Sequence, residues 1–522
     1  MATMKKSTRS PPRSKHKEPP ARPSRKPKGK PCVTSVSYGT TAGCPAHHGA
    51  GAREYHPVPC GTAFKPGQFG RMFPELPMLS VPDEMLEVLA NAMVDVDGNP
   101  ADDNATIPAG FTYLGQFIDH DVTFDTTTMP EVQIDPQSIF NFRTPKLEMD
   151  SVYGTGPSTQ PYLYEDGVRM RVGATQTGQG DPSIPAGMPN DLLRLNGIAV
   201  IGDPRNDENL AVAQIHLAFI KFHNKVVDSL TGGGLTGNAL FTEARRLVTW
   251  HYQRMIIDDY LDRLCAPDVL DDVITNGPRF FKFEGEPFMP VEFSVAAYRF
   301  GHSQVRNAYN FNRVFRSGGV TPATLDLLFT FSHLSGPRTP ETIPVPSDWI
   351  ADWRRLFEVG GGVSPDATRK IDPLLATSLH NLPGNGGSLP FRNMQRGVRM
   401  GLPSGQAVAE AVSATPLTPA ELSQGPDGSA AVLGGMHINS PLWYYILKEA
   451  QVQQNGDRLG EVGSRIVAEV IIGMMDGDPL SFRRQNPAFE PTLFKSGESP
   501  VRAGKYTMVD LLRFTDDINP IG

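Results

Sequence analysis

The clearest hydrophobic pattern along the chain is a set of amphipathic segments separated by stretches rich in Gly and Pro. Apolar residues that recur every three or four positions predict α-helices at 84–95, 210–230, 238–265 and 462–475. Frequent Gly and Pro at 160–200 and 318–390 predict loops with short helices. Strand patterns are few, and no internal repeat is present. The chain is therefore predicted to be mainly α, a single large helical domain with long loops and very little β structure.

A shorter apolar segment, Gly110–Asp125 (GFTYLGQFIDHDVTFD), also has helical spacing and predicts a short buried helix. It contains Gln116 and His120 one helical turn apart, with a carboxylate on each side of the histidine, at Asp119 and Asp121. Polar and titratable groups rarely enter such a setting without partners. Two interpretations follow. The histidine either belongs to the core at a helix end, or it is a catalytic group flanked by two carboxylates.

Composition places the 522 residues among ordinary globular chains, with 39% hydrophobic and 20% charged residues. Residues 1–30 hold eleven Lys and Arg against one Glu, a net charge of about +10. The whole chain has a formal net charge of −7, so the remaining residues carry about −17. We expect a basic, Pro-rich, largely disordered extension at 1–60, followed by the folded domain at 61–522. With an acidic body, a nucleic-acid function is not expected.

No apolar run reaches the roughly 18 residues of a membrane helix, so integral membrane association is not expected. The first residues have charge but no apolar stretch behind it, unlike a standard secretory signal. The chain is therefore expected to be cytoplasmic or exported by a non-standard route. The four cysteines are too few for a fold built on disulfides.

Two short segments suggest metal sites that closer inspection disfavours. Cys44, His47, His48 and Cys60 fit no standard spacing of zinc ligands. Residues 95–104 (DVDGNPADDN) resemble the start of a calcium-binding loop but contain Pro and lack the Glu expected at the twelfth position. A plain turn is the favoured interpretation there.

The loop at 143–154 (RTPKLEMDSVYG) is a better candidate for a cation. Thr144, Glu148 and Asp150 alternate along it with the carbonyl of Lys146, and alternate residues of an extended chain point the same way. Oxygen ligands of this kind suit Ca²⁺, and Asp121 could add another carboxylate. An exposed acidic loop explains the same residues equally well.

The start of the 210–230 helix carries a second group of polar residues. Arg205 and Glu208, three positions apart, could both face a pocket at the helix N-terminus, while His216 and His223 are interpreted as packing residues. Further on, His302 follows an apolar helical face, and Gly301 before it leaves room for a flat ligand beside the chain. The sequence has no phosphate-binding loop, GxSxG, HExxH or CxxC motif.

Five ordered motifs together resemble the animal-type haem peroxidases of the peroxidase–cyclooxygenase superfamily. They are LGQFIDHDVTFD, TPKLEMDSVYG, GDPRNDE, AAYRFGH and RNMQRG, spread over nearly 300 residues. The resemblance covers roughly residues 60–500, and the acidic, loop-rich sequence is more similar to the bacterial branches. It implies a haem peroxidase that reduces H₂O₂ and oxidises halide, thiocyanate or aromatic donors through a compound I intermediate.

The resemblance assigns His120 as the distal histidine, a general base and acid for peroxide, and Arg205 as the cation that stabilises developing charge. Gln116 matches the glutamine that holds water or halide. His302 matches the proximal iron ligand, and Asn393 the residue that accepts the other ring N–H of that ligand.

Further matches concern attachment of the cofactor, haem b. Asp119 and Glu208 match the carboxylates that form ester links to haem, and Arg299 and Arg396 match arginines near its proximal face, the latter placed to pair with a propionate. Asn209 stands where one branch of the family has a Met that adds a sulfonium link. The absence of that link favours iodide, thiocyanate, bromide or phenols over chloride as donors.

The calcium loop of the family matches Asp121, Thr144, Lys146 by its carbonyl, Glu148 and Asp150, with Glu148 where Asp is usual. Two alternatives remain for function. One is a fatty-acid dioxygenase of the same superfamily, which is disfavoured because Arg299 occupies the place of the radical Tyr, and Tyr298 lies one position earlier. The other is a non-catalytic, Ca²⁺-stabilised haem or adhesion protein.

Overall fold

The computed structural model of the protein describes residues 67–96, 99–125, 135–332, 344–382 and 387–522. All of them belong to one compact unit, which includes Lys65–Gly522. The predicted extension at 1–60 lies outside the described residues, as do Cys44, His47, His48 and Cys60. Within the described ranges, no helix combines the length and apolar character needed to cross a membrane.

Helices dominate the described chain, as predicted. The longer ones are α1 (Asp83–Ala92), α2 (Gly110–Val122), α4 (Leu210–Leu230), α5 (Gly237–Met255), α7 (Pro267–Asn276), α9 (Leu389–Arg399), α12 (Gly425–Leu433), α13 (Leu442–Gln454), α14 (Glu461–Gly477) and α16 (Met508–Thr515). Shorter ones are α3 (Asp150–Tyr153), α6 (Asp262–Leu264), α8 (Leu325–Thr330), α10 (Gly405–Ala411), α11 (Pro419–Leu422) and α15 (Phe482–Gln485).

Tighter and wider helical turns connect these elements. The 3₁₀ turns are η1 (Pro100–Asp102), η2 (Pro136–Ser138), η3 (Pro161–Leu163), η4 (Pro204–Asp207), η7 (Ala297–His302), η9 (Ser347–Trp349), η10 (Trp353–Arg355) and η11 (Thr377–His380). Two π-helical segments, η5 (Ile256–Leu261) and η6 (Glu292–Ala296), are both buried. The segment 291–306, expected to be an α-helix, is therefore a π-turn followed by a 3₁₀ turn.

The strands are short and form small separate sheets. They are β1 (Gly67–Gly70), β2 (Val94–Asp95), β3 (Asp103–Pro108), β4 (Phe140–Asn141), β5 (Arg194–Leu195), β6 (Ile198–Ala199), β7 (Met289–Pro290), β8 (Ala308–Tyr309), β9 (Ala323–Thr324), β10 (Ala367–Arg369) and β11 (Leu375–Ala376). The largest sheet has the order β4-β1-β7, in which β1 is antiparallel to β4 and parallel to β7.

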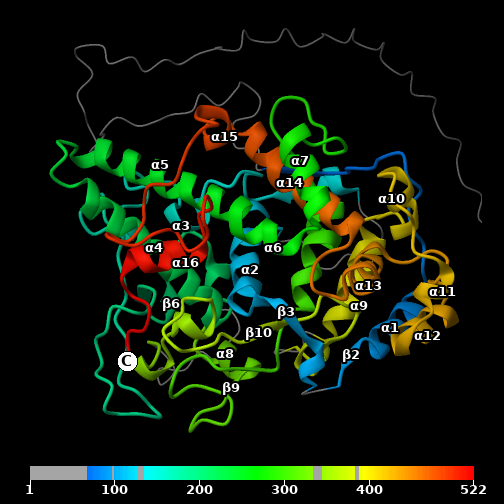
Figure 1. Cartoon of the computed structure of the whole chain (residues 1–522), viewed down its shortest axis with the longest axis horizontal. Helices are drawn as coiled ribbons and strands as arrows, with labels where there is room; N and C mark the ends of the chain where they lie inside the picture. The colour runs from blue at the N-terminus through cyan, green and yellow to red at the C-terminus, as the bar shows by residue number, and fades with distance from the viewer. Residues whose placement is uncertain (1–66, 97–98, 126–134, 333–343, 383–386) are drawn as a thin grey trace, which may run out of the picture. The chain divides into compact units, whose positions relative to one another are not determined.

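The α2 helix lies inside the fold, and in Figure 1 it stands between α4 on one side and α9 and α13 on the other. It packs against α4 and η7, and Phe117 stacks on Phe219 of α4 at 4.7 Å between ring centroids. Gly115 lets η5 approach α2 closely, because a Cβ there would lie 2.4 Å from the hydroxyl of Tyr260. The apolar face of α2 thus fixes the direction of its polar residues.

Of the segment 95–104, the structure describes residues 95, 96 and 99–104, and the described aspartates face an arginine. Arg369 donates to Asp95 at 2.6 Å and to Asp103 at 2.8 Å, and Asp102 lies 3.6 Å away. A guanidinium therefore neutralises the acidic residues that resembled a calcium loop.

Candidate active site

His120 lies at the end of α2 with its two ring nitrogens in different surroundings. Its ring is buried, with 4% of the residue exposed. Nδ1 lies 2.8 Å from Oδ1 of Asn206, while Nε2 lies 3.8 Å from a carboxylate oxygen of Glu208. Glu208 lies deep inside the protein, yet 40% of its side-chain surface is exposed, so unfilled space remains beside Nε2.

Burial, together with the positive charge of Arg205, lowers the pKa of His120 to about 3. The imidazole is therefore neutral near pH 7. A neutral imidazole whose free nitrogen faces open space can accept a proton from a bound molecule and return it.

Arg205 comes from the turn η4 and is held from several directions. Its guanidinium donates to Oδ2 of Asp203 at 2.8 Å and to the carbonyl of His120 at 3.0 Å, and it lies over the Phe124 ring at 4.3 Å. Burial acts to raise the pKa of Asp203, but hydrogen bonds and charge from Arg205 and Arg143 outweigh it and lower that pKa. The buried Asp203 carboxylate is therefore ionised and fixes the arginine beside His120.

Gln116 is oriented by the residue that begins α4. The side-chain oxygen of Asn209 accepts from the Val212 amide at 3.0 Å, which caps the helix, and its side-chain nitrogen donates to the Gln116 oxygen at 3.0 Å. One asparagine therefore caps α4 and restrains Gln116 on α2. We call Gln116, His120, Arg205 and Glu208 the His120 cluster.

Asp119 connects this cluster to a second one. Burial raises its pKa, while the charges of Arg205 and Arg299 oppose the rise. Burial also raises the pKa of Glu208, and the charge of Asp119 adds to that effect. Asp119 is thus within electrostatic reach of residues from η4 and from η7, which are far apart in the sequence.

The second cluster, called the His302 cluster, consists of Arg299, His302, Asn393 and Arg396. Burial, then the charge of Arg299, lowers the pKa of His302 to about 3. Its Nδ1 lies 2.8 Å from the side-chain nitrogen of Asn393, whose oxygen accepts from Arg299 at 2.8 Å. Arg299 also donates to the Ser294 carbonyl at 3.0 Å.

This arrangement pairs Asn393 with His302 as the resemblance implies, but with a different amide orientation. The expected role has the Asn393 oxygen accepting the Nδ1–H of His302, whereas here that oxygen faces Arg299. Acceptance from His302 requires the amide to turn by 180°, or the oxygen to serve both donors.

Two further features concern the surroundings of His302. Among the described residues, nothing beyond the chain neighbours lies within 4 Å of the position a Cβ would take at Gly301. Arg396 forms an ion pair with Asp125, just beyond the end of α2. The arginine expected to meet a propionate is therefore neutralised by a protein carboxylate in this structure.

The loop before α3 brings the expected cation ligands towards α2. Asp121 is fully buried and accepts from the Met149 amide at 3.1 Å, and the Thr144 hydroxyl donates to Glu148 at 2.5 Å. Burial and the charge of Asp150 raise the pKa of Asp121 well above its usual value. Within the described residues, Oδ1 of Asp150 is buried without a hydrogen-bond partner.

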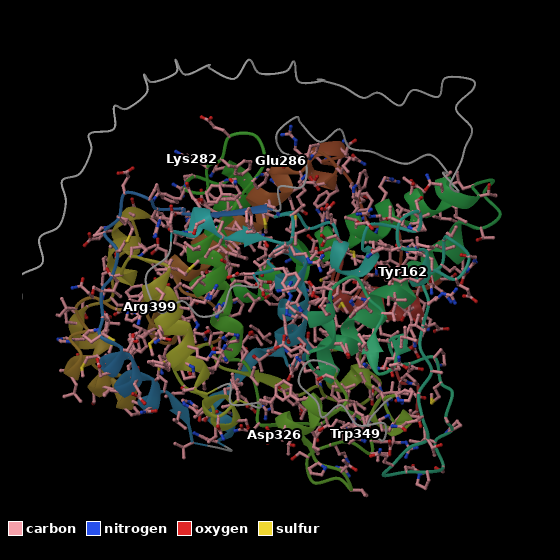
Figure 2. The ribbon with its side chains drawn as sticks, turned by 180° about the vertical axis from the view of Figure 1, so that it is seen from behind. Tyr162, Lys282, Glu286, Asp326, Trp349 and Arg399 are labelled. Atoms are coloured by element: carbon pink, nitrogen blue, oxygen red, sulfur yellow. The ribbon has the colours of Figure 1, made fainter. Side chains whose placement is uncertain are left out.

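Across the described parts of the chain, no group of three or more His, Cys, Asp and Glu side chains has the arrangement of a preformed metal site. The side chain of Lys146 points to the surface, where it pairs at 3.3 Å with Glu286, labelled in Figure 2. The charges of Asp150 and Glu148 nevertheless add to the effect of burial in raising the pKa of Asp121, and the charge of Glu148 does the same for Asp150.

Several residues of the two clusters were not singled out from the sequence. Asp203, Asn206 and Asp125 act as hydrogen-bond or ionic partners, and Trp443 donates from its indole to the Arg299 carbonyl at 3.0 Å. The Asp-Pro-Arg-Asn run at 203–206 lies in the GDPRNDE motif, from which the sequence assigns roles only to Arg205 and Glu208. Its side chains could be assigned only once α2 and η4 were known to meet.

The chain belongs to the animal haem peroxidase family, whose family model matches residues 126–404. Among solved structures, it is similar to peroxidase A from Dictyostelium discoideum, with a TM-score of 0.59 and 16% identity over 88% of this chain and 94% of that one. It also resembles a fatty acid alpha-dioxygenase from Arabidopsis thaliana, with a TM-score of 0.56 and 16% identity over 85% of this chain and 75% of that one.

The curated relatives that the chain matches in sequence are much longer than the matched regions. A peroxidase-like protein from Margaritifera margaritifera is 25% identical over 255 residues, 38% of this chain and 32% of that protein. Thyroid peroxidase from Mus musculus is 24% identical over 381 residues, 67% of this chain and 39% of that protein. The matches thus span less than half the length of these relatives. The family and its fold imply haem as the cofactor and an oxidoreductase as the class of protein.

Proposed function

We propose that the protein is a haem-dependent peroxidase that reduces H₂O₂ and oxidises small anionic or aromatic donors. The observation that carries the proposal is the geometry of His120, whose free Nε2 faces an open space bordered by Glu208 while Arg205 is fixed beside it. A base and a cation at one end of a buried helix suit proton transfer to and from a peroxide.

The His302 cluster fits haem. His302 would hold the iron, the open space beside Gly301 would admit the edge of a flat ring, and Asn393 would orient the imidazole. When bound, haem supplies the redox centre that peroxide oxidises by two electrons. Arg396 would exchange Asp125 for a propionate, or share its charge between the two.

The remaining residues of the His120 cluster handle protons and charge. His120 takes a proton from H₂O₂ at Nε2 and returns it to the leaving oxygen, so one residue serves as base and then as acid. Arg205 supplies a fixed positive charge next to the oxygen that becomes negative. Gln116, restrained by Asn209, orients water or a small anion in the same space.

Asp119 and Glu208 are proposed to attach the haem through ester links. Their raised pKa values support this role, because burial next to the apolar edge of a porphyrin favours the uncharged form of a carboxyl group. Denaturing electrophoresis with haem staining tests it. Haem that separates completely from the polypeptide after peroxide treatment would refute the links.

A Ca²⁺ ion is proposed to bind among Asp121, Thr144, Glu148, Asp150 and the carbonyl of Lys146. Burial and the neighbouring carboxylates raise the pKa values of Asp121 and Asp150, and within the described residues a buried oxygen of Asp150 has no hydrogen-bond partner. Both observations support a cation at this place. A hard cation with flexible oxygen coordination satisfies such a group. Asp121 adjoins His120, so the ion would also fix the end of α2.

The donors are proposed to be iodide, thiocyanate, bromide or phenols rather than chloride. Asn209 uses its side chain to cap α4 and to hold Gln116, and it cannot form the sulfonium link that a Met provides in one branch of the family. Without that link the haem is expected to be less oxidising.

Haem-reconstituted protein tests the whole proposal. We expect a Soret band and H₂O₂-dependent oxidation of a chromogenic phenol and of iodide. A haem-loaded protein inert to peroxide would show that the proposal is wrong. Oxygen uptake with a fatty acid and no added peroxide would instead support a fatty acid dioxygenase, the class of the similar Arabidopsis thaliana protein.

One observation weighs against that second activity. Arg299, three positions before His302, is fixed between the Ser294 carbonyl and Asn393 and offers no phenol. Tyr298 is buried and stacked on Phe293 at 4.6 Å between ring centroids. Burial and Tyr260 raise the pKa of the Tyr298 phenol well above its usual value.

A further inference from the structure

Three buried side chains form a hydrogen-bonded chain behind His120. Nδ1 of His120 lies 2.8 Å from the Asn206 oxygen, and the Asn206 nitrogen lies 2.9 Å from Nδ1 of His216 on α4. Asn206 and His216 are fully buried. The family motifs in the sequence gave no role to Asn206 and only a packing role to His216.

The two ends of this chain differ. At the His120 end, Nε2 faces the open space beside Glu208. At the other end, Nε2 of His216 has no hydrogen-bond partner within the described residues, and its ring packs edge-on to Phe117 at 6.1 Å. The chain therefore starts at the reactive nitrogen and ends in the apolar packing between α2 and α4.

An amide between two imidazoles determines where each ring carries its proton. The oxygen can only accept and the nitrogen can only donate. With the oxygen towards His120, Nδ1 of His120 must be the protonated nitrogen, and its Nε2 keeps a lone pair. The reversed amide would leave Nε2 protonated and unable to act as a base.

The turn that carries Asn206 is rigidly fixed. Next to it, Asp207 accepts two hydrogen bonds from Arg194, at 2.7 and 2.9 Å, and the backbone N–H of Asn206 donates to the Asp203 carbonyl at 3.1 Å. The turn thus fixes the place of the Asn206 side chain, whose amide nitrogen faces Nδ1 of His216 while its oxygen faces His120.

We propose that Asn206 is a positioning residue that keeps the proton of His120 on Nδ1, and that His216 holds the Asn206 amide in the required orientation. The effect of Asn206 on catalysis rests on the proposed peroxidase function. The position of the proton on His120 does not depend on that function. The statement therefore has a test in the haem-free protein and another in the haem-loaded protein.

The first test is ¹⁵N NMR of the histidine rings in the haem-free full chain, with His120→Gln used to assign the signals. We expect Nδ1 of His120 to give the signal of a protonated ring nitrogen and Nε2 that of an unprotonated one. In Asn206→Leu, which has similar volume but no amide, both neutral tautomers should appear. A protonated Nε2 in the wild type, or an unchanged spectrum in Asn206→Leu, overturns the proposal.

Asn206→Asp keeps an oxygen that can accept the hydrogen bond from His120, which Asn206→Leu removes. An aspartate still accepts from Nδ1 of His120, and Arg205 and Arg143 nearby offset its charge. The wild-type ¹⁵N signature of His120 should therefore be retained in Asn206→Asp. If Asn206 were only structural, the ¹⁵N signature of His120 would not depend on whether residue 206 offers an acceptor.

The second test is the rate of reaction of haem-loaded protein with H₂O₂. Removal of an orienting partner commonly costs about 10–100-fold, and we expect a loss of this size for Asn206→Leu and a loss near the lower end for His216→Phe. His223→Phe is the matched control. This buried histidine of the same helix bonds instead to Tyr153 and the Val168 carbonyl, and its loss should leave the rate unchanged.

The results separate the two proposals. If the ¹⁵N signature is as expected but the haem-loaded protein does not react with H₂O₂, the proposed function fails and the proton assignment stands. If the protein is a peroxidase whose rate and signature do not change in His216→Phe, the role of His216 is refuted. His216→Phe also serves if Asn206→Leu does not fold, because it leaves the η4 turn and its ion pairs intact.

Discussion

His120 is the residue on which the proposed chemistry depends most directly. Replacing it with Ala removes the imidazole, which is neutral near pH 7 and can exchange a proton at Nε2. We expect the rate of reaction with H₂O₂ to fall by about 10²–10⁴-fold, the usual contribution of general acid–base catalysis. Stopped-flow spectroscopy of the haem-loaded variant measures it.

His380→Ala is the control for that substitution. His380 is part-buried, and its Nε2 bonds to the Met93 carbonyl rather than to either cluster. Its removal should leave the rate within twofold of the wild type, as an order-of-magnitude expectation for a site without contact to the reactants. An equal loss in His120→Ala and His380→Ala would contradict the role given to His120.

The sequence identified individual residues of the site better than it identified their partners. Helical spacing placed Gln116 and His120 on one face of a helix, and the resemblance supplied Arg205 and His302. The partners Asn206 and Asp125 remained unassigned, because they lie 86 and 271 positions from His120 and Arg396, the residues they bond. Asp203 lies only two positions from Arg205, but it also bonds Arg143 across 60 positions. Such contacts depend on how elements pack, which periodicity does not encode.

At the scale of elements, the long amphipathic helices were predicted well and the turn before His302 was not. The residues of α4 and α14 repeat their apolar positions over several turns and begin at recognisable sites, such as the Asn209 cap. The run at 292–302 is equally apolar but short, and tertiary packing imposes a π-turn and then a 3₁₀ turn on it. Apolar pattern alone does not distinguish these helical types.

The cap of α4 allows stability to be separated from the positioning of Gln116. We expect Asn209→Ala to lower the free energy of unfolding by about 1 kcal/mol, since it removes the side chain that accepts from the Val212 amide. Asn209→Ser should recover most of that loss, because a hydroxyl also caps a helix. Urea unfolding measures both variants. A serine variant no more stable than the alanine variant would show that capping is not the origin of the loss.

The loop that precedes α3 should respond to Ca²⁺. If the ion binds as proposed, the melting temperature of the wild type should rise on adding Ca²⁺ and fall with a chelator. The stabilisation should be about 2.7 kcal/mol when free Ca²⁺ is 100 times Kd. Asp121→Asn removes a carboxylate from the group and should abolish most of the response.

Asp372→Asn is the matched control for the calcium experiment. Burial raises the pKa of Asp372 to about 7, as burial does for Asp150, but its side chain accepts from the Leu374 amide. The variant should keep the full response to Ca²⁺. Differential scanning calorimetry with and without chelator distinguishes the two variants, and a wild type without any Ca²⁺ response would contradict the site.

At the scale of the whole molecule, buried histidines predict loss of stability in acid. Nε2 of His251 accepts from the backbone amides of Thr492 and Leu493, so it must stay unprotonated, and Nδ1 bonds to the Leu247 carbonyl. Burial lowers the pKa of His251 to about 4, against 6.5 as its usual value. Between these values the unfolded chain binds more protons, so the free energy of unfolding falls as the pH falls through this window.

The contribution of one such histidine is measurable. Over this range a single group changes stability by up to about 1.4 kcal/mol per pH unit. His251→Gln, which cannot be protonated, should show a shallower decrease between pH 6.5 and 4 than the wild type does. Urea unfolding at several pH values compares the slopes, and equal slopes would show that His251 is not a source of the acid sensitivity.

The arrangement of the whole molecule explains why the residues of the candidate site could be proposed from the sequence, whereas their arrangement in space could not be predicted. These residues come from α2, η4, η7 and α9, and only the order and spacing of motifs linked them before the structure was known. The structure adds the reason they meet, because α2 packs against both α4 and η7.

Asp203 has a consequence for how this protein can change over evolutionary time. Its buried carboxylate bonds both Arg205 and Arg143, and Arg143 in turn pairs with Asp150 at 3.3 Å. A substitution at any one of these four positions alters the charge balance that the others require. Their effects should therefore be epistatic, with double changes tolerated where single changes are not. Replacement of these four charged residues during evolution should therefore follow only a few orders of substitution, most of which pass through a less stable protein.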